Sequence, residues 1–523
     1  MSEARKGNRL AILLAMAMFV LVVDTSLMNV SISQVVVDLD TTVSGVQSAI
    51  ALEALVSAAF ILIGSKVADL IGRKRAYAIG LICYAIGAIA MTLSRDLTAI
   101  IVFWAIVGGL GASLLLPSMQ ALIHGNFRDD EQRRVYALVG AAAAIAAAVG
   151  PLLGGAITTF LSWRVGFLLE AVMIAVVLAG LGLVRDAKYT GPRGIDLVGA
   201  ILSVVGMGGT VLGILVWQEG GDSVAILMGI GVASLLGLGV WLFRAKAAGR
   251  LTLIDPEVLR SAGFRLGISG QLLQQIALGG SMIVLPIYFQ IVLEYDALRA
   301  GLSLAPLSLS MFGASLLMSK RGGSRRPSSI IGAGYLLMLV GMAVLIPFVP
   351  RAGSGWAFVI PLVITGTGLG LLVSQLNNYT LSPVDEQRVS EAAGVNSAGG
   401  SFGLSFGLAL AGALMLATLS VTFTSMANDS HVLPPEVQGQ VADALETDAE
   451  LVTNTNLDAL LEDEPPEIQA EIIRINTEAR PLALQIALVV PLLSAALGLV
   501  VAARMRRLPD PVASGAADSV LGG

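Results

Sequence analysis

The fold of this chain is decided by a short charged stretch, Ser65-Lys-Val-Ala-Asp69-Leu-Ile-Gly72-Arg73-Lys74-Arg75. It lies between two apolar runs, each of which is long enough to cross a bilayer. The stretch is too short to form a domain, and it is too charged to remain in lipid, where each buried charge is costly. It therefore predicts a tight hydrophilic turn between two membrane-spanning helices.

The rest of the chain has the composition of a membrane protein. Of its 523 residues, 55% are hydrophobic and 13% are charged, whereas a soluble domain carries about 25% charged residues. The single cysteine, Cys83, excludes an intrachain disulfide. Apolar runs of bilayer length must be helices, because a spanning segment has to satisfy its own backbone hydrogen bonds. We predict fourteen spans, at 9–33, 44–71, 74–94, 98–124, 134–160, 164–185, 195–217, 223–244, 264–293, 299–318, 327–349, 357–382, 393–423 and 481–504.

The lysines and arginines test this count. With a cytoplasmic N-terminus, 26 of the 32 Lys and Arg residues fall in cytoplasmic segments and six fall outside. Cytoplasmic loops carry an excess of these residues, and a missed or extra span would exchange the sides of every later loop. The distribution therefore supports fourteen spans with both termini cytoplasmic. We expect this multi-pass protein to lie in the plasma membrane.

The 65–75 stretch resembles the signature between helices 2 and 3 of the major facilitator superfamily, Gly-x-Leu-Ala-Asp-x-x-Gly-Arg-Lys/Arg. The matching positions are Asp69, Gly72, Arg73 and Lys74, while Ser65 and Lys66 depart from the pattern. The resemblance implies a gating role, in which Gly72 ends the helix with a positive φ and Asp69 pairs with a cation or caps a helix. The plainer alternative is topogenic charge followed by a helix C-cap.

A second match lies in the fifth span, where Gly150-Pro151-Leu-Leu-Gly154-Gly155 resembles the antiporter motif of the same family. Pro151 removes a backbone hydrogen bond and bends the helix, and the glycines allow close helix contact. Plain packing is the alternative. Because this motif accompanies exporters more than importers in the family, it favours efflux and a gating role.

The first span contains Asp24-Thr-Ser-Leu-Met-Asn29-Val, which resembles the signature of the fourteen-span drug:proton antiporter branch. An acid in mid-membrane is costly and is a functional hypothesis by default, so Asp24 is the first candidate for proton coupling. A structural acid bonded to Asn29 or to a neighbouring helix is the alternative. Glu53 adds a second carboxyl, expected to face the interface between the bundles. Glu170 is a third and weaker candidate, because its helix is usually peripheral.

One feature of the family is missing. The fourth span usually carries an arginine ahead of its Gly-x-Gly run, and this arginine is tied to proton coupling, but Ala105 stands at that place. No Lys or Arg is expected at mid-membrane depth anywhere in the chain. Proton coupling would therefore proceed without an arginine, and facilitated diffusion or a substrate-driven mechanism becomes a stronger alternative.

Uncharged polar residues recur at membrane depth, mainly in the spans of the second half. Such residues either line a cavity or hydrogen-bond to one another between helices. We predict a mixed polar and apolar wall for substrate, with interhelical bonding as the alternative. Its members are Asn29, Gln271, Gln274, Gln275, Tyr288, Gln290, Gln375, Asn378 and Asn396.

The spans divide as 6 + 2 + 6, which predicts the larger variant of the major facilitator fold in an all-α integral membrane protein. The boundaries are 1–186 for the first six-helix bundle, 187–262 for two linker helices, 263–510 for the second bundle and 511–523 for a cytoplasmic tail. Residues 320–326 echo the 65–75 stretch without its acid. An outer loop, 424–480, holds thirteen acids. The spacing of its apolar residues predicts two or three short amphipathic helices, around Val441, Leu457 and Ile472.

The prediction is a secondary transporter, not an enzyme, that exports amphiphilic or drug-like small molecules by alternating access, in exchange for protons. One alternative is an exporter of lipid or lipid-like metabolites with the same fold. The other is a non-transporting docking protein that uses the 424–480 loop. No cofactor, metal or nucleic acid is expected. The expected partners are the small-molecule or lipid substrate, protons and membrane lipid, and the protein is expected to act as a monomer.

Overall fold

The computed structural model describes residues 3–127, 129–186, 194–218, 221, 223–321, 326–349, 353–384, 388–434, 453–462 and 464–509. Every regular element within these ranges is a helix. Fourteen helical runs in the described part of the chain are long and apolar enough to cross a membrane. The predicted all-α membrane fold with fourteen spans is therefore confirmed.

The first six spans come from nine helical elements. The fourth span joins three of them, including a π-helical segment, and the sixth ends in a short 3-10 turn. Their bounds are α1 Glu3–Leu39, α2 Val43–Ile71, α3 Arg73–Leu93, α4 Leu97–Ala99, η1 Ile100–Gly108, α5 Gly109–Asn126, α6 Asp129–Phe160, α7 Trp163–Ala179 and η2 Gly180–Leu183.

The remaining spans begin with a helical pair, α8 and α9. The ninth span ends in a second π-helical segment, η4, and the fourteenth is made of α17 and α18. The bounds are α8 Leu197–Gln218, α9 Val224–Ala247, η3 Val258–Arg260, α10 Ala262–Ile287, η4 Tyr288–Val292, α11 Ala297–Arg321, α12 Pro327–Phe348, η6 Gly355–Phe358, α13 Val359–Leu381, α14 Val389–Asn428, α16 Asn454–Leu460, α17 Pro466–Ala487 and α18 Val489–Met505.

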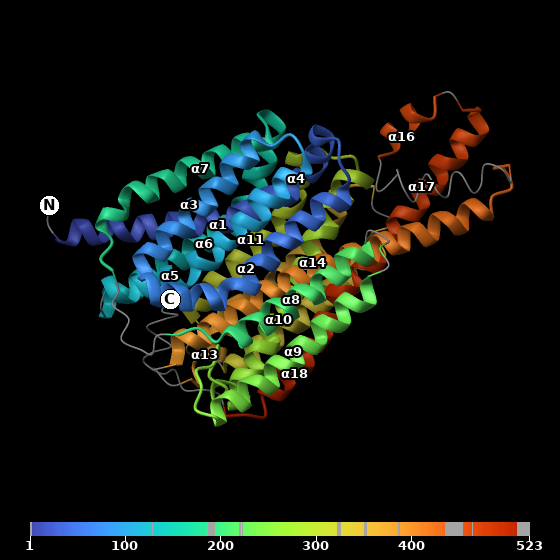
Figure 1. The fold of residues 1–523 in the computed structure, drawn as a ribbon. Coiled ribbons are helices and arrows are strands. Elements are labelled where there is room, and N and C mark those ends of the chain that lie inside the picture. Colours follow the sequence, from blue (N-terminus) through green and yellow to red (C-terminus); the bar gives the residue numbers. More distant parts are fainter. Residues whose placement is uncertain are drawn as a thin grey trace.

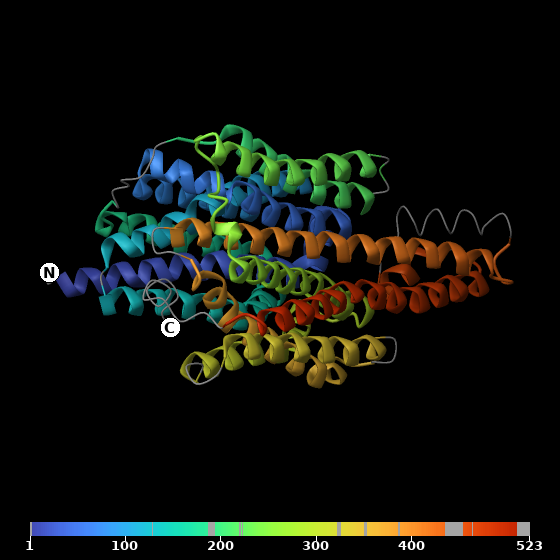
Figure 2. The same cartoon turned by 90° about the horizontal axis from the view of Figure 1, so that it is seen from below.

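The helices run roughly along one direction, and the start of α1 and the end of α18 lie toward the same end of the molecule (Figure 2). We call this the inner end, in keeping with the side indicated by the lysines and arginines, and the opposite one the outer end. The first half is α1–α7 and the second half is α10–α18. Between them, α8 and α9 pack as a pair, and α8 contacts both α2 and α14 (Figure 1).

The charged turn at 65–75 forms as expected. Gly72 has φ +99°, a conformation that side chains with a Cβ rarely adopt, and it ends α2 just before α3 begins at Arg73. At the other end of α2, the Thr42 hydroxyl accepts a hydrogen bond from the N–H of Gly45 at 3.0 Å, which caps the helix. These two residues fix the limits of α2.

The linker pair is tied to α14 at the inner end by an ion cluster. Lys246 of α9 pairs with Asp255 at 2.9 Å, and Arg388, next to the start of α14, approaches the same carboxylate at 3.6 Å. Partial burial raises the pKa of Asp255, but the Lys246 bond, the Glu257 N–H and the two cationic charges outweigh it and hold this pKa below its usual value. Asp255 is therefore a charged anchor between the linker pair and the second half.

At the outer end, α14 and α17 extend beyond the other helices, and α16 packs on α17 (Figures 1 and 2). The predicted amphipathic helices near Leu457 and Ile472 correspond to α16 and α17, and Pro465 and Pro466 mark the start of α17. The segment predicted around Val441 lies outside the described residues. So do positions 322–325 of the 320–326 echo and the 511–523 tail. We call the described residues 453–480 the cap.

Candidate functional site: a buried acid cluster and the interface between the halves

Asp24 is buried in the first half and has two neutral hydrogen-bond donors. Its side chain is 1% exposed. The Trp104 indole N–H lies 3.1 Å from both carboxylate oxygens, and the Tyr84 hydroxyl donates to Oδ2. The donors come from η1 and α3, so three different spans meet at this carboxyl. The structural alternative named Asn29 or a neighbouring helix as the partner of Asp24. The Asn29 amide donates instead to the Thr25 carbonyl at 2.8 Å, whereas the bonds to neighbouring helices are present.

The other two predicted acids lie around the same tyrosine. Glu53 of α2 and Glu170 of α7 both interact electrostatically with Asp24, and Tyr84 interacts electrostatically with all three acids. Glu170 is 3% exposed, and neither of its oxygens has a hydrogen-bond partner. Its side chain therefore lies inside the first half, although its helix was expected to be peripheral. The structure brings the three acids together in one cluster.

Tyr84 and Trp104 were not predicted from the sequence. Trp104 precedes Ala105, the place where the family arginine is missing, and it supplies a neutral donor there. Its position depends on η1, a π-helical segment of nine residues, and such segments often occur at functional sites. The ring also contacts Phe167 edge-on, with centroids 6.3 Å apart. No sequence periodicity signals a π-helix, so only the intramembrane aromatic residue itself could have drawn attention.

The interface between the halves carries unpaired polar atoms at its outer part. The backbone N–H of Ser33 in α1 donates to Gln290 Oε1 of η4 at 3.2 Å. Asn29 lies one helical turn earlier on the same face of α1. Asn29 Oδ1, Ser33 Oγ and Gln290 Nε2 are buried without hydrogen-bond partners. This set offers an acceptor, a hydroxyl and a donor from both halves.

The remaining predicted cavity residues are spread along the second half. A Cβ added at Gly400 of α14 would lie 3.5 Å from Gln271 Nε2 and 3.7 Å from Gln275 Nε2, so these amides face the α10–α14 contact. Gln274, which is 2% exposed, and Gln275 each have an unpaired Oε1. Along the α10–η4 span, Gln271 and Gln290 are separated by about 28 Å at 1.5 Å per residue. The amides therefore do not form one compact site.

Four of the predicted cavity residues lie elsewhere in the second half. The Asn396 amide donates to Asn377 Oδ1 at 2.5 Å, and Asn378 Oδ1 accepts from the Ser382 hydroxyl at 2.9 Å. Gln375 is buried on α13. Tyr288 donates to the Val349 carbonyl at 2.9 Å. These contacts match the interhelical alternative for Asn396 and Tyr288.

The glycines of the 150–155 motif lie where helices cross closely. A Cβ added at Gly150 or Gly154 would crowd α1, and one at Gly155 would clash with the backbone of Ala297 at the start of α11. A Cβ added at Gly301 of α11 would likewise clash with the backbone of Pro151. The N–H of Leu298 also donates to the Thr159 hydroxyl at 3.0 Å. The two halves are therefore in tight contact at the outer ends of α6 and α11.

The 65–75 turn is bonded to other parts of the first half. Asp69 pairs with Arg73 at 2.7 Å. The Lys74 N–H donates to Asp186 Oδ1 at 3.0 Å, and its ammonium group donates to the Val184 carbonyl at 2.8 Å. The motif thus ties the α2–α3 turn to the segment just after η2 in this conformation.

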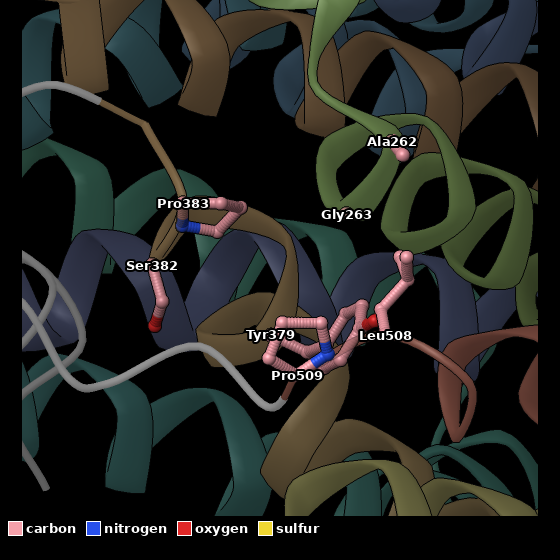
Figure 3. Close-up of a pocket in the computed structure, with 7 residues that line it drawn as sticks. All are labelled: Ala262, Gly263, Tyr379, Ser382, Pro383, Leu508 and Pro509. Carbon is pink, nitrogen blue, oxygen red and sulfur yellow. The ribbon is translucent and has the colours of Figure 1, made fainter.

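A cavity of about 300 Å³ opens at the inner ends of α10, α13 and α18 (Figure 3). It lies at the opposite end of α10 from Gln290. Its lining is mainly apolar, with polar atoms from Tyr379 and Ser382. The lining residues are Ala262, Gly263, Tyr379, Ser382, Pro383, Leu508 and Pro509.

These features define a class of protein: a multi-pass membrane protein built from two helical halves. The family model described as "Major Facilitator Superfamily" matches residues 14–408, and the chain belongs to that superfamily. Within the described residues, no group of three or more His, Cys, Asp or Glu side chains could hold a metal ion.

Curated relatives are similar over most of the chain. The "Probable actinorhodin transporter" of Streptomyces coelicolor is 25% identical over 436 residues, covering 82% of this chain and 75% of the relative. The "Multidrug resistance protein Stp" of Mycobacterium tuberculosis is 27% identical, covering 78% and 75%. The "Puromycin resistance protein pur8" of Streptomyces alboniger is 28% identical, covering 77% and 81%. These names agree with the resemblance to the fourteen-span drug:proton antiporter branch.

Solved structures share the fold. A bacterial homologue of the human lysosomal transporter Spinster, in an inward-facing and unoccupied conformation, superposes with a TM-score of 0.64 at 12% identity, covering 97% of this chain and 99% of that one. A POT family transporter in complex with 5-aminolevulinic acid gives 0.58 at 14% identity, covering 95% and 96%.

Proposed function

We propose that this transporter exports amphiphilic or drug-like small molecules by alternating access, in exchange for protons. The observation that carries the proposal is the cluster of three buried or half-buried acids around Tyr84. Ionisable residues inside the membrane are costly, and they mark ion pathways and proton relays in transporters. A structural role alone does not account for Glu170, because its carboxyl oxygens have no partner.

The substrate is proposed to bind between the halves. The unpaired atoms of Asn29, Ser33 and Gln290 offer hydrogen bonds to an uncharged polar group, beside apolar surface. The tight crossing of α6 and α11 at their outer ends supports a state that is closed outside. The names of the relatives, which include drug-resistance proteins and an antibiotic transporter, support an exporter of small molecules.

The proposed division into two bundles has the boundaries expected from the sequence, 1–186 and 263–510, with the linker pair at 187–262. Rocking of one bundle against the other would expose the site alternately. We propose that the protein lies in the plasma membrane with both termini cytoplasmic, and that it works as a monomer.

The test is transport of ethidium or puromycin in proteoliposomes, with and without an imposed pH gradient. The proton gradient should accelerate transport by the wild type, and Asp24→Asn and Glu53→Gln should each remove most of that acceleration. Asp40→Asn is the matched control, because Asp40 is exposed and its φ of +47° suits asparagine. Normal pH-driven transport by both variants would show that the carboxyl mechanism is wrong.

A lipid-like substrate is the second candidate, favoured by the apolar lining of the inner cavity (Figure 3). Lipids could reach such a cavity from the membrane at the inner end. Proteoliposomes that contain fluorescent lipid analogues distinguish the two candidates. Movement of lipid analogues, without transport of ethidium or puromycin, would favour the lipid candidate.

A further inference from the structure

Asp24 is surrounded by groups that can give or share a proton but cannot neutralise it with a charge. The titratable groups that interact with it are Glu53 from α2, Tyr84 from α3 and Glu170 from α7. Trp104 from η1 adds a donor that does not titrate. Of the other helices packed on α1, neither α6, α10 nor α11 contributes a described titratable group that interacts with Asp24.

We propose that Tyr84 and Trp104 are positioning residues for proton exchange at Asp24. This inference rests on the proposed proton coupling. The Trp104 indole N–H lies within hydrogen-bond distance of both Asp24 oxygens, and it fixes the orientation of this carboxyl group. Tyr84 donates to one oxygen and keeps a lone pair with which its hydroxyl oxygen can accept.

The hydrogen bonds of the cluster define where a proton can go. When Asp24 is ionised, the Tyr84 hydroxyl donates to Oδ2. When a proton arrives at Asp24, the new carboxyl O–H can donate to the Tyr84 oxygen. Only O–H bonds change, and the cluster gains one positive charge for each proton bound. Tyr84 can therefore keep a hydrogen bond to Asp24 both before and after the proton binds.

Two variants test the roles, each with a matched control. Tyr84→Phe removes the hydroxyl that bonds to Asp24, whereas Tyr77→Phe removes a hydroxyl that is buried on the same helix without a partner. Trp104→Phe removes the indole donor, and Trp163→Phe removes an indole that donates to Asp38 instead. All four keep an aromatic ring in place, which limits damage to the fold.

The readout is infrared spectroscopy of the full-length protein in proteoliposomes as pH is changed. The carbonyl band of the Asp24 carboxyl is assigned as the band that Asp24→Asn removes. In Tyr84→Phe and in Trp104→Phe, this band should move to higher frequency. The pH at which this band titrates should also change, because a hydrogen bond to the ionised group is lost. The control variants should leave both quantities unchanged.

Equal spectra in Tyr84→Phe and Tyr77→Phe would overturn the inference. This outcome is separate from failure of the proposed function, because the infrared experiment needs no transported substrate. If Asp24 titrates with the expected shifts but a pH gradient does not drive ethidium or puromycin transport, the positioning roles stand and the proton-coupled function fails. For each variant, size-exclusion chromatography measures the fraction of protein that is folded.

A second inference comes from the outer end of the molecule, where the cap contacts η4. Arg480 of α17 is 2% exposed, and it donates to the Ile291 carbonyl at 3.0 Å and to Asn476 Oδ1 at 2.8 Å. It also bonds to Asn454 of α16. A buried arginine is costly unless its donors are used, so this guanidinium holds α16, α17 and η4 together.

The same region holds a second connection. Thr455 of α16 donates through its N–H and its hydroxyl to the Glu294 carboxylate, at 3.1 and 2.5 Å. Glu294 has φ +53°, an uncommon conformation for a side chain with a Cβ, and it lies two residues after the end of η4. Next to Ile291, Gln290 accepts the bond from Ser33 of the first half. A continuous set of contacts thus runs from the cap to the interface between the halves.

We infer that the cap is a latch for the outer gate: it holds η4 in the position at which Gln290 binds Ser33. Opening of the outer side must separate Gln290 from Ser33. The contacts of Arg480 and Thr455 keep η4 in the position that favours this bond. The cap would then bias the transporter toward the state that is closed outside.

Spin-label distance measurements test the latch in a Cys83→Ser background. Labels are placed at Val37→Cys in α1 and Arg299→Cys in α11, both of which have exposed side chains at the outer end. Arg480→Gln should add or enlarge a population with a longer distance between labels. Arg474→Gln is the matched control, since Arg474 is exposed on the same helix and pairs with Glu471 and Glu478.

Thr455→Val provides a milder variant if Arg480→Gln folds poorly. It removes the hydroxyl bond to Glu294 from an exposed position, so folding should be preserved. The long-distance population should rise severalfold in this variant as well. Distance distributions identical to those of Arg474→Gln, in both variants, would overturn the latch.

Discussion

At the scale of single residues, the choice of partner for Asp24 matters more than its burial. A cation beside the carboxyl would hold it ionised through the whole transport cycle. A phenol and an indole instead satisfy its oxygens without adding charge. Asp24 can then be orientated in both protonation states. The loss of the family arginine at Ala105 is consistent with this arrangement, because Trp104 takes over the donor role one residue earlier.

We expect the buried carboxyl of Glu170 to serve the function of the protein and to lower the stability of its fold. Replacement by methionine, which has a similar volume, removes an unpaired buried carboxyl beside Asp24. We expect Glu170→Met to raise the free energy of unfolding by about 1 kcal/mol, within the range seen when buried ionic groups are replaced by apolar ones. Thermal unfolding in detergent measures this gain, and pH-driven transport should fall in the same variant.

Glu471→Met is a useful comparison for this experiment. Glu471 pairs with Arg474 and accepts a bond from Ser430 at 2.6 Å, so its replacement should not stabilise the protein. A lower melting temperature for Glu170→Met than for the wild type would mean that the Glu170 carboxyl stabilises the fold through a structural partner, and a functional role would then not be needed to explain its presence.

At the scale of elements, the sequence predicts those features that depend on apolar length and turn chemistry. The α2–α3 turn at Gly72 and the α17 start at Pro465 and Pro466 belong to this group. The sequence does not predict η1, because a π-helix changes the direction of Trp104 without changing composition. It also does not predict the Arg480 contacts, because a guanidinium next to a predicted span boundary can lie in water as easily as inside the protein.

The crossing of α6 and α11 should be sensitive to a single methyl group. A Cβ at Gly155 meets the backbone of Ala297, and backbone atoms cannot move aside cheaply. Overpacking of this kind costs about 1–3 kcal/mol. We expect Gly155→Ala to weaken the outer-closed state and to reduce transport by about tenfold, measured in proteoliposomes.

Gly140→Ala is the control for this prediction, because Gly140 lies on the same helix with open space at its Cβ position. It should transport normally, and it should be slightly stabilised by the better helix propensity of alanine. Equal transport by both variants would mean that the close crossing has no role in the cycle.

The ion cluster around Asp255 should stabilise the protein in a pH-dependent way. Its pKa is held below the usual value in the folded state, so its contribution is fully present above the pKa of the unfolded chain, about 3.9. This contribution is lost as pH falls through the lower, folded-state pKa. Asp255→Asn should therefore melt at a lower temperature than the wild type at pH 7, and the difference should shrink below about pH 4.

The melting temperatures are compared across a pH series, with Asp96→Asn as the control. Asp96 caps the short helix α4 from an exposed position. A difference between Asp255→Asn and the wild type that is constant from pH 7 to about pH 3 would rule out the charge of Asp255 as its cause.

At the scale of the whole molecule, the sequence predicts the span count and the 6 + 2 + 6 order because these depend on sums over many residues. A single misplaced polar side chain does not change them. The site is different, because each of its contacts depends on one side-chain direction. Asp24, Glu53 and Glu170 could be recognised as intramembrane acids, but their meeting at Tyr84 requires α1, α2, α3 and α7 to be rotated correctly about their axes. The predicted polar wall for substrate fails for the same reason. Two of its members, Gln271 and Gln290, lie about 28 Å apart along their span.

The orientation in the membrane depends on the same kind of sum, and it can be tested in intact cells. In a Cys83→Ser background, one new cysteine is placed at Glu464 of the cap and another at Arg250, between α9 and α10, both exposed. With 26 of the 32 lysines and arginines on the inner side, the inner end should face the cytoplasm. A membrane-impermeant maleimide should therefore label Glu464→Cys in intact cells, and it should label Arg250→Cys only after permeabilisation. The reverse labelling pattern would mean that the molecule has the opposite orientation in the membrane. The cap latch and the direction of proton movement would then have to be reassigned together, because both depend on which end of α1 faces the cytoplasm.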